Sequence, residues 1–481
     1  RYHSFIFTGN KELSIVPAVA ALAATLHLQA PMFSASKFLL SPASLPAMAL
    51  RPPSYLPARC APYSRPPPFG SVARATPCLS AAATAVSSSP STTKKVLVPI
   101  AMGTEEMEAV ILAGVLRRAG ADVTLASVED ELEVEASCGT HIVADKPIAA
   151  CTDQVFDLVA LPGGMPGSVR LRDNKILQRI TVRQAEEKRL YGAICAAPAV
   201  VLMPWGLHRG KKVTCHPSFI GDLPTFRAVE SNVQVSGELT TSRGPGTAFQ
   251  FALSFVKQLF GPHAAEDMEC TLMAQIDADL ERSTEVNKVE WSFDHNPQVL
   301  IPIANGLEEM EIIMLADILR RANINVVLAS VEKSTSIVGS QLMEIVADQC
   351  ILGASDSKYD LIVLPGGPAG AERLHKSKIV QKLLEEQKQA DRMYGGIGYS
   401  PLILQRQGLL QDKKATAHPA IINQLTCQVI DRSKVVIDGK LITGKGLGTA
   451  IDFSLAIIRK FFGHARAKLV ANGIVFDYPK S

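Results

Sequence analysis

The chain has 481 residues, of which 47% are hydrophobic and 20% are charged. This length exceeds one ordinary hydrophobic core, and the composition is that of a folded globular protein, so at least two domains are expected. The formal net charge of +3 comes from residues 1–93, which hold seven of the 49 Lys and Arg residues but only one acid, Glu12. The rest of the chain is slightly acidic, which argues against a nucleic-acid-binding protein.

Residues 1–93 are predicted to be a transit peptide with an unstructured extension. From Met48 to residue 93 the segment is rich in Ser, Ala, Pro and Arg and contains no acid. This composition is typical of organelle targeting, and the Met-Ala start favours import into the chloroplast stroma. The alternative is a Pro/Ser-rich tail without a targeting role. The apolar stretch at 14–28 is too short to span a membrane and contains Pro17, so no membrane segment is expected.

Short apolar segments then alternate with helical patterns. Helices are expected at 105–120 and 174–188, and strands in KVLVPIA (95–101), DVTLASV (122–128), FDLVALPGG (156–164), YGAIC (191–195) and KKVTC (211–215). Apolar runs separated by helices indicate parallel strands that are buried on both faces. The fold class is therefore α/β, a doubly wound sandwich, which binds ligands beyond the carboxyl ends of its strands.

The whole pattern occurs twice. GTEEME at 103–108 returns as GLEEME at 306–311, LPGG at 161–164 returns at 364–367, and YGAICAAP at 191–198 returns as YGGIGYSP at 394–401. A repeat of about 200 residues is a domain rather than a solenoid unit. Two homologous domains are predicted, at 94–290 and 297–478, joined by a linker at 291–296 within a charged, aperiodic region.

Cys195 is the candidate nucleophile. It follows an apolar strand and precedes AAPAVVLM, which is expected to begin a helix. Such a turn presents a nucleophile at the edge of the sheet, and a helix N-terminus favours the thiolate. The alternative is a buried, unreactive cysteine. The nine cysteines form no CxxC pair and no metal-ligand spacing with histidines, so neither a disulfide framework nor a metal site is expected.

Other polar groups are predicted at the same edge. Glu108 lies one turn into the first helix, where a buried carboxyl is suited to proton transfer, whereas Glu105 and Glu106 are interpreted as acids favoured by the helix dipole. His216 follows KKVTC, and the alternative for it is an ordinary loop histidine. The Gly163–Gly164 pair offers N–H groups to an oxyanion, although a tight turn explains it equally well. GKGLGT at 444–449 is interpreted as a helix-entry turn rather than a phosphate loop.

With GTEEMEAV, LPGG, AICAAP, CHP and RGPGTAFQFAL in this order, each copy resembles the DJ-1 branch of the PfpI superfamily. The resemblance implies two tandem flavodoxin-like domains, similar to class I glutamine amidotransferases. It also implies a glyoxalase or deglycase that acts on methylglyoxal or glyoxal without cofactor, metal or glutathione. Cys195 then stands at the nucleophile position, Glu108 at that of its acid partner and His216 at that of the general acid/base. Gly164 and Ala196 stand at the oxyanion positions.

The second copy departs from this pattern. Glu311 and His418 remain, but Gly398 replaces the cysteine and Tyr399 replaces the small residue after it. The second domain is therefore predicted to be catalytically dead. Because members of the family form homodimers, the two copies are expected to pack as an intramolecular pseudo-dimer, and further association of chains is left open. The competing hypothesis is a non-catalytic plastid protein, redox-sensing or chaperone-like, that is needed for chloroplast development.

Overall fold

The structure is a computed structural model that describes residues 93–224, 226–273 and 280–479. All of these residues belong to one compact unit, Val86–Ser481. The predicted transit peptide lies outside the described residues except for Thr93. Within the described part of the chain, no helix is both long enough and apolar enough to cross a membrane.

The first repeat is built on a seven-stranded sheet in the order β5-β2-β1-β6-β7-β9-β8. All neighbouring strands are parallel except β8, which is antiparallel to β9. The strands are β1 (Lys95–Ile100), β2 (Asp122–Ser127), β5 (Lys146–Pro147), β6 (Leu158–Leu161), β7 (Leu190–Ile194), β8 (Val233–Ser236) and β9 (Leu239–Ser242). This is the predicted doubly wound α/β fold.

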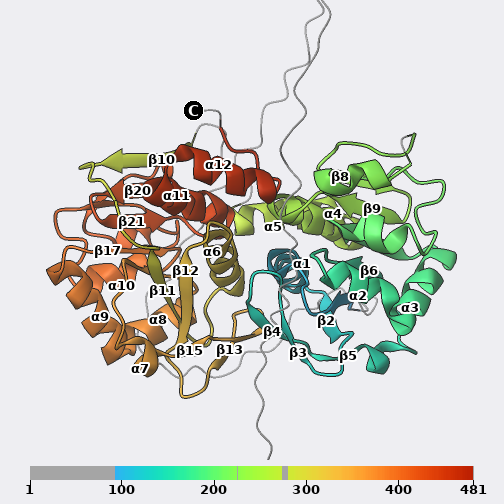
Figure 1. The fold of residues 1–481 in the computed structure, drawn as a ribbon, viewed down its shortest axis with the longest axis horizontal. Coiled ribbons are helices and arrows are strands. Elements are labelled where there is room, and N and C mark those ends of the chain that lie inside the picture. The colour runs from blue at the N-terminus through green and yellow to red at the C-terminus, as the bar shows by residue number, and fades with distance from the viewer. Residues whose placement is uncertain (1–92, 225, 274–279, 480–481) are drawn as a thin grey trace, which may run out of the picture. The chain divides into compact units, whose positions relative to one another are not determined.

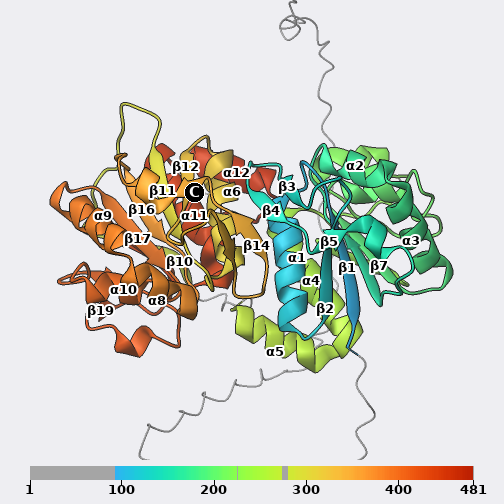
Figure 2. The same cartoon turned by 90° about the horizontal axis from the view of Figure 1, so that it is seen from below.

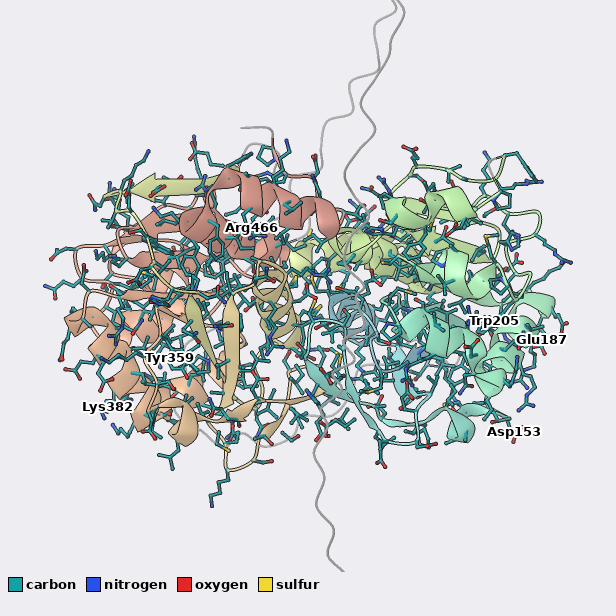
Figure 3. All side chains as sticks on the ribbon, in the orientation of Figure 1. Asp153, Glu187, Trp205, Tyr359, Lys382 and Arg466 are labelled. Atoms are coloured by element: carbon teal, nitrogen blue, oxygen red, sulfur yellow. The ribbon has the colours of Figure 1, made fainter. Side chains whose placement is uncertain are left out.

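Helices cover both faces of this sheet (Figure 1). Successive strand residues point to opposite faces, and accordingly Val96 and Val98 of β1 join one core cluster whereas Leu97 joins another. Side chains fill the layers between the sheet and the helices (Figure 3). The helices are α1 (Glu106–Arg118), α2 (Gly167–Asp173), α3 (Lys175–Glu186), α4 (Ala248–Phe260) and α5 (Pro262–Leu272).

The second repeat has the same architecture with one additional strand, in the order β10-β20-β21-β17-β16-β11-β12-β15. Its strands are β10 (Glu281–Val286), β11 (Gln298–Ile303), β12 (Asn325–Ser330), β15 (Gln349–Cys350), β16 (Leu361–Leu364), β17 (Met393–Ile397), β20 (Ser433–Asp438) and β21 (Leu441–Gly444). Its helices are α6 (Glu309–Arg321), α7 (Ile351–Ala354), α8 (Pro368–Lys376), α9 (Lys378–Gln389), α10 (Pro401–Arg406), α11 (Ala450–Phe462) and α12 (His464–Gly473).

Two local predictions are wrong. The region expected to be aperiodic contains β10, which pairs in parallel with β20 and is held by ion pairs from Arg282 to Asp452 and from Lys460 to Glu285. Strand β10 lies at the edge of the sheet, where a strand can be polar. Its sequence therefore shows no apolar pattern from which a strand could be predicted. KKVTC is not a strand of the main sheet and forms only an isolated bridge at Val213, while its counterpart forms the short β18 (Lys414–Ala415) beside β19 (Gln428–Val429).

The two repeats contact each other through equivalent elements. A small four-stranded sheet combines β3 (Glu133–Glu135) and β4 (His141–Val143) with β13 (Ser336–Val338) and β14 (Glu344–Val346), and β4 pairs antiparallel with β14. Helix α1, which lies along β1 and β2 in Figure 2, also contacts α6, and both helices contribute to one core cluster. Hydrophobic burial is therefore continuous from one repeat to the other.

Candidate active site

Cys195 follows β7 directly and has a φ of 64°. A residue other than glycine is rarely found in this left-handed region, and such strain is concentrated at functional sites. Gly163 makes room for it, because a Cβ at Gly163 would lie 2.6 Å from the Cys195 Cβ and 2.9 Å from Glu108 Oε2. The turn therefore places the partly exposed Cys195 at the carboxyl end of β7.

Glu108 is fully buried beside this turn. The Glu105 side chain caps α1 by accepting the Glu108 N–H at 2.6 Å, and Glu108 Oε2 accepts the Gly163 N–H at 2.7 Å. The carboxyl also interacts with the Cys195 thiol. Burial raises the pKa of Glu108 to about 8, so this carboxyl carries a proton near neutral pH.

The expected stabilisation of a Cys195 thiolate by a helix is not found. Burial, followed by the negative charges of Glu108 and Glu105, raises the pKa of the Cys195 thiol well above its ordinary value. The segment after the elbow is only a five-residue π-helix, Pro198–Leu202, rather than a regular helix with a full dipole. A protonated Glu108 opposes the thiolate less than an ionised Glu108 does, because the nearest negative charge is then absent.

Backbone N–H groups lie where an oxyanion would need them. Gly164 has a φ of 90°, and its N–H hydrogen-bonds to the Cys195 sulfur. The N–H of Ala196 follows the nucleophile directly and has no carbonyl partner among the described residues. Both predicted oxyanion residues therefore border the sulfur, and an oxygen that develops charge on a carbon bonded to sulfur would meet N–H donors.

His216 is half-buried, and its ring nitrogens both have partners. Its backbone N–H donates to the Cys195 carbonyl at 2.8 Å, and its Nδ1 accepts from the Ser218 N–H at 3.2 Å. Its Nε2 lies 3.3 Å from the Gly473 carbonyl, which makes Nε2 the protonated nitrogen. Burial lowers the pKa of His216. The ring is therefore neutral and tied to the second repeat.

These residues border a cavity of about 320 Å³. Cys195, Gly164, Ala196 and His216 line it from the first repeat, and Arg321 and Gly473 line it from the second. The volume is at the lower end for small-molecule sites, which suits a small substrate. The site of the first repeat is thus completed by the second.

Sequence analysis missed the contribution of Arg321, which ends α6. Its guanidinium donates to Glu105 Oε1 at 2.8 Å and to Asp317 at 2.6 and 3.1 Å. Glu105 is the N-cap of α1 and Glu106 lies in its first turn, in line with their interpretation as acids favoured by the helix dipole, but both are also buried and Glu105 pairs with Arg321. The only sequence feature that pointed to Arg321 was the Arg-Arg pair that ends both α1 and α6, because proximity between the repeats cannot be inferred from spacing along the chain.

The equivalent site of the second repeat keeps the framework without the sulfur. Glu311 Oε2 accepts the Gly366 N–H at 2.6 Å, and burial raises the pKa of Glu311 to about 8. Gly398 has a φ of 65° in place of the cysteine, and the Tyr399 ring stacks on His418 with centroids 4.8 Å apart. The polar partners remain, but the nucleophile is absent and an aromatic ring covers the histidine.

The chain is similar to known proteins along both repeats. The DJ-1/PfpI family matches residues 94–258 and 297–460. Protein DJ-1 homolog A of Arabidopsis thaliana is 45% identical over 379 residues, covering 78% of this chain and 97% of that protein, and DJ-1 homolog B is 45% identical, covering 78% and 86%. Glutathione-independent glyoxalase DJR-1.2 of Caenorhabditis elegans is 35% identical over 167 residues, covering 34% of this chain and 87% of that protein.

Among solved structures, oxidized DJ-1 of Toxoplasma gondii is 41% identical, covers 38% of this chain and 98% of its own, and has a TM-score of 0.37. The family match extends over both repeats, and together its two segments account for more than half of the chain. The chain therefore belongs to the DJ-1/PfpI family and carries two domains of that family in tandem.

Proposed function

We propose that the protein is a glutathione-independent glyoxalase or deglycase that acts on methylglyoxal or glyoxal through Cys195. The observation that carries this proposal is a strained, partly exposed cysteine that lines a cavity of about 320 Å³ and lies next to a fully buried carboxyl whose pKa is about 8. Support also comes from the relative that is named a glutathione-independent glyoxalase.

In the proposed reaction the Cys195 sulfur adds to the aldehyde carbon of methylglyoxal while the thiol proton leaves to solvent. The protonated Glu108 gives its proton to the aldehyde oxygen, which yields a hemithioacetal and leaves Glu108 as a carboxylate able to accept the next proton. The N–H groups of Gly164 and Ala196 stabilise the negative charge on that oxygen. A proton then moves from the former aldehyde carbon to the neighbouring carbon through an enediol, with Glu108 as its carrier. Water cleaves the resulting thioester, which releases lactate and restores the thiol.

His216 is a positioning group in this scheme. Because its Nδ1 accepts from Ser218 and its Nε2 donates to Gly473, neither nitrogen is free to act as a base in this arrangement. The ring instead borders the cavity and ties it to the second repeat. General acid/base chemistry by His216 would require the ring to leave at least one of these partners.

The second repeat is proposed to be catalytically dead and to act as the intramolecular counterpart of a dimer partner. The paired strands β4 and β14, the contact of α1 with α6, and the reciprocal ion pairs Arg118–Glu308 and Arg321–Glu105 support this role. It would explain why a repeat without a nucleophile remains in the chain. A pseudo-dimer of this kind predicts a monomeric chain in sedimentation equilibrium.

The test is lactate formation from methylglyoxal without glutathione, using the full chain, Cys195→Ala and Glu108→Ala. Turnover that both substitutions abolish would support the proposal. Absence of turnover in a folded wild-type protein would refute it and favour the redox-sensing or chaperone-like alternative. Glu311→Ala is the matched control, since it changes the equivalent carboxyl of the repeat that lacks the cysteine and should leave turnover intact.

Chloroplast localisation is a further part of the proposal and rests on the composition of residues 1–93. It is tested by fusing this segment to a fluorescent protein and following import into isolated chloroplasts. Failure of import would refute the plastid assignment without affecting the proposed chemistry.

A further inference from the structure

Three metal-ligand side chains converge at the edge of the Cys195 cavity. They are Glu106 at the start of α1, Cys138 in the turn between β3 and β4, and Asp317 in α6 of the second repeat. Their ligand atoms all lie within 4.8 Å of one another. Glu106 and Asp317 are fully buried, whereas Cys138 is partly exposed and lines the cavity, which provides a route for an ion.

The cluster holds more carboxyl groups than cationic groups. Glu105, Glu106 and Asp317 are buried carboxyls, and Arg321 is the cation that pairs with Glu105 and Asp317. A bound divalent cation would pair with these carboxylates and displace any proton they carry, because metal ligands must be deprotonated.

The second repeat does not have the same metal-ligand side chains at its equivalent positions. The positions equivalent to Glu106, Cys138 and Asp317 are Glu309, Gln341 and Gly114. The backbone arrangement is nevertheless alike, since the Cys138 N–H donates to Glu106 at 3.1 Å and the Gln341 N–H donates to Glu309 at 2.7 Å. The difference between the two locations therefore lies in the metal-binding side chains and not in the local fold.

We propose that Glu106, Cys138 and Asp317 bind one divalent cation of the zinc type. One sulfur and two carboxylate oxygens are a donor set that zinc accepts, and three protein ligands leave a fourth position for water or another ligand. Thiolate coordination disfavours magnesium and calcium. When the ion binds, the Cys138 S–H bond breaks, a metal–sulfur bond forms and the proton leaves to solvent, without any oxidation.

The spacing of the ligand atoms is compatible with zinc after at most a small adjustment. Ligand atoms around tetrahedral zinc are separated by roughly 3.5 Å, given bonds of about 2.0 to 2.3 Å, and the three atoms here lie within 4.8 Å of one another. Arg321 occupies both oxygens of Asp317 but does not exhaust their lone pairs, and it keeps its bond to Glu105. The site is separate from the chemistry proposed at Cys195, which requires no metal.

The test uses the full chain carrying Cys195→Ala, so that the elbow thiol cannot bind the probe. Chelator-treated protein is titrated with Co²⁺, whose thiolate complexes absorb in the near ultraviolet, and zinc stoichiometry is measured by equilibrium dialysis. We expect one ion per chain and a thiolate-to-metal band that disappears in Cys138→Ser, a nearly isosteric change at a partly exposed position. Glu106→Gln should weaken binding, and its repeat-related control Glu309→Gln should not.

Circular dichroism of each variant separates loss of binding from loss of folding. The proposal is overturned if the folded Cys195→Ala protein binds no zinc. It is equally overturned if the absorption band survives Cys138→Ser, or if Glu309→Gln weakens binding as much as Glu106→Gln does. Because none of these readouts depends on turnover, failure of the glyoxalase proposal would leave this test intact.

Discussion

Replacement of Arg321 by methionine should destabilise the protein more than the same change at Arg118. Arg321 donates three hydrogen bonds to two carboxyls that are almost completely buried, Asp317 and Glu105. Removing one member of a buried ion pair leaves an uncompensated charge and costs about 3–5 kcal/mol. Arg118 pairs with a single carboxylate, Glu308, and the corresponding loss is about 1–3 kcal/mol.

The asymmetry has a simple structural origin. Asp317 has Gly114 as its repeat-related position, so Arg118 has no second carboxylate on its neighbouring helix. The measurement is urea unfolding at neutral pH, followed by circular dichroism, on both single variants and on Arg321→Met/Asp317→Ala. The double variant should recover part of the lost stability because one unpaired carboxylate is removed with the cation. Equal destabilisation by the two arginine substitutions would refute this reasoning.

Three further experiments test the site. Glu108→Gln should lower turnover by about 10²-fold or more because an amide cannot carry the proton; wild-type turnover should fall as the pH rises through about 8, where Glu108 loses its proton, and an unchanged rate at pH 9 would contradict this role. Gly398→Cys in a Cys195→Ala chain should not restore turnover or fast alkylation by iodoacetamide, whereas adding Tyr399→Ala should expose the new thiol to alkylation. Gly163→Ala should abolish turnover, since its Cβ would lie 2.6 Å from the Cys195 Cβ; wild-type kinetics in that variant would show that the turn is less constrained than it appears.

Local sequence was sufficient for much of the fold. Continuous apolar runs located β1, β2, β6 and β7, and helical patterns located α1 and α3, because parallel strands buried on both faces and their crossover helices differ in this way. The turn at Gly446 also forms a helix entry, in which Thr449 Oγ1 accepts the Gly446 N–H. The prediction of a strand at KKVTC is wrong because its buried apolar residues belong to a loop that packs on the core. Strand β10 was missed because an edge strand needs few apolar residues.

The residues of the first site could be proposed from sequence because each follows a strand or a first helical turn, and parallel strands bring such positions to one edge. The protonation states of these residues could not be predicted from the sequence. The pKa values of Cys195 and Glu108 depend on burial and on charges from distant segments, including Arg321. A local pattern therefore names the reactive groups, whereas the tertiary environment decides which of them holds the proton.

What the sequence determined by itself is the duplicated α/β domain, the elbow cysteine of the first copy and its loss from the second. These properties depend on residue identity and short-range order. Only the tertiary structure placed Arg321 and Gly473 in the first cavity, and only it brought Cys138 together with Glu106 and Asp317. Such contacts join residues up to 257 positions apart, and they exist because two symmetric helix faces bury apolar surface against each other rather than because of any spacing along the chain.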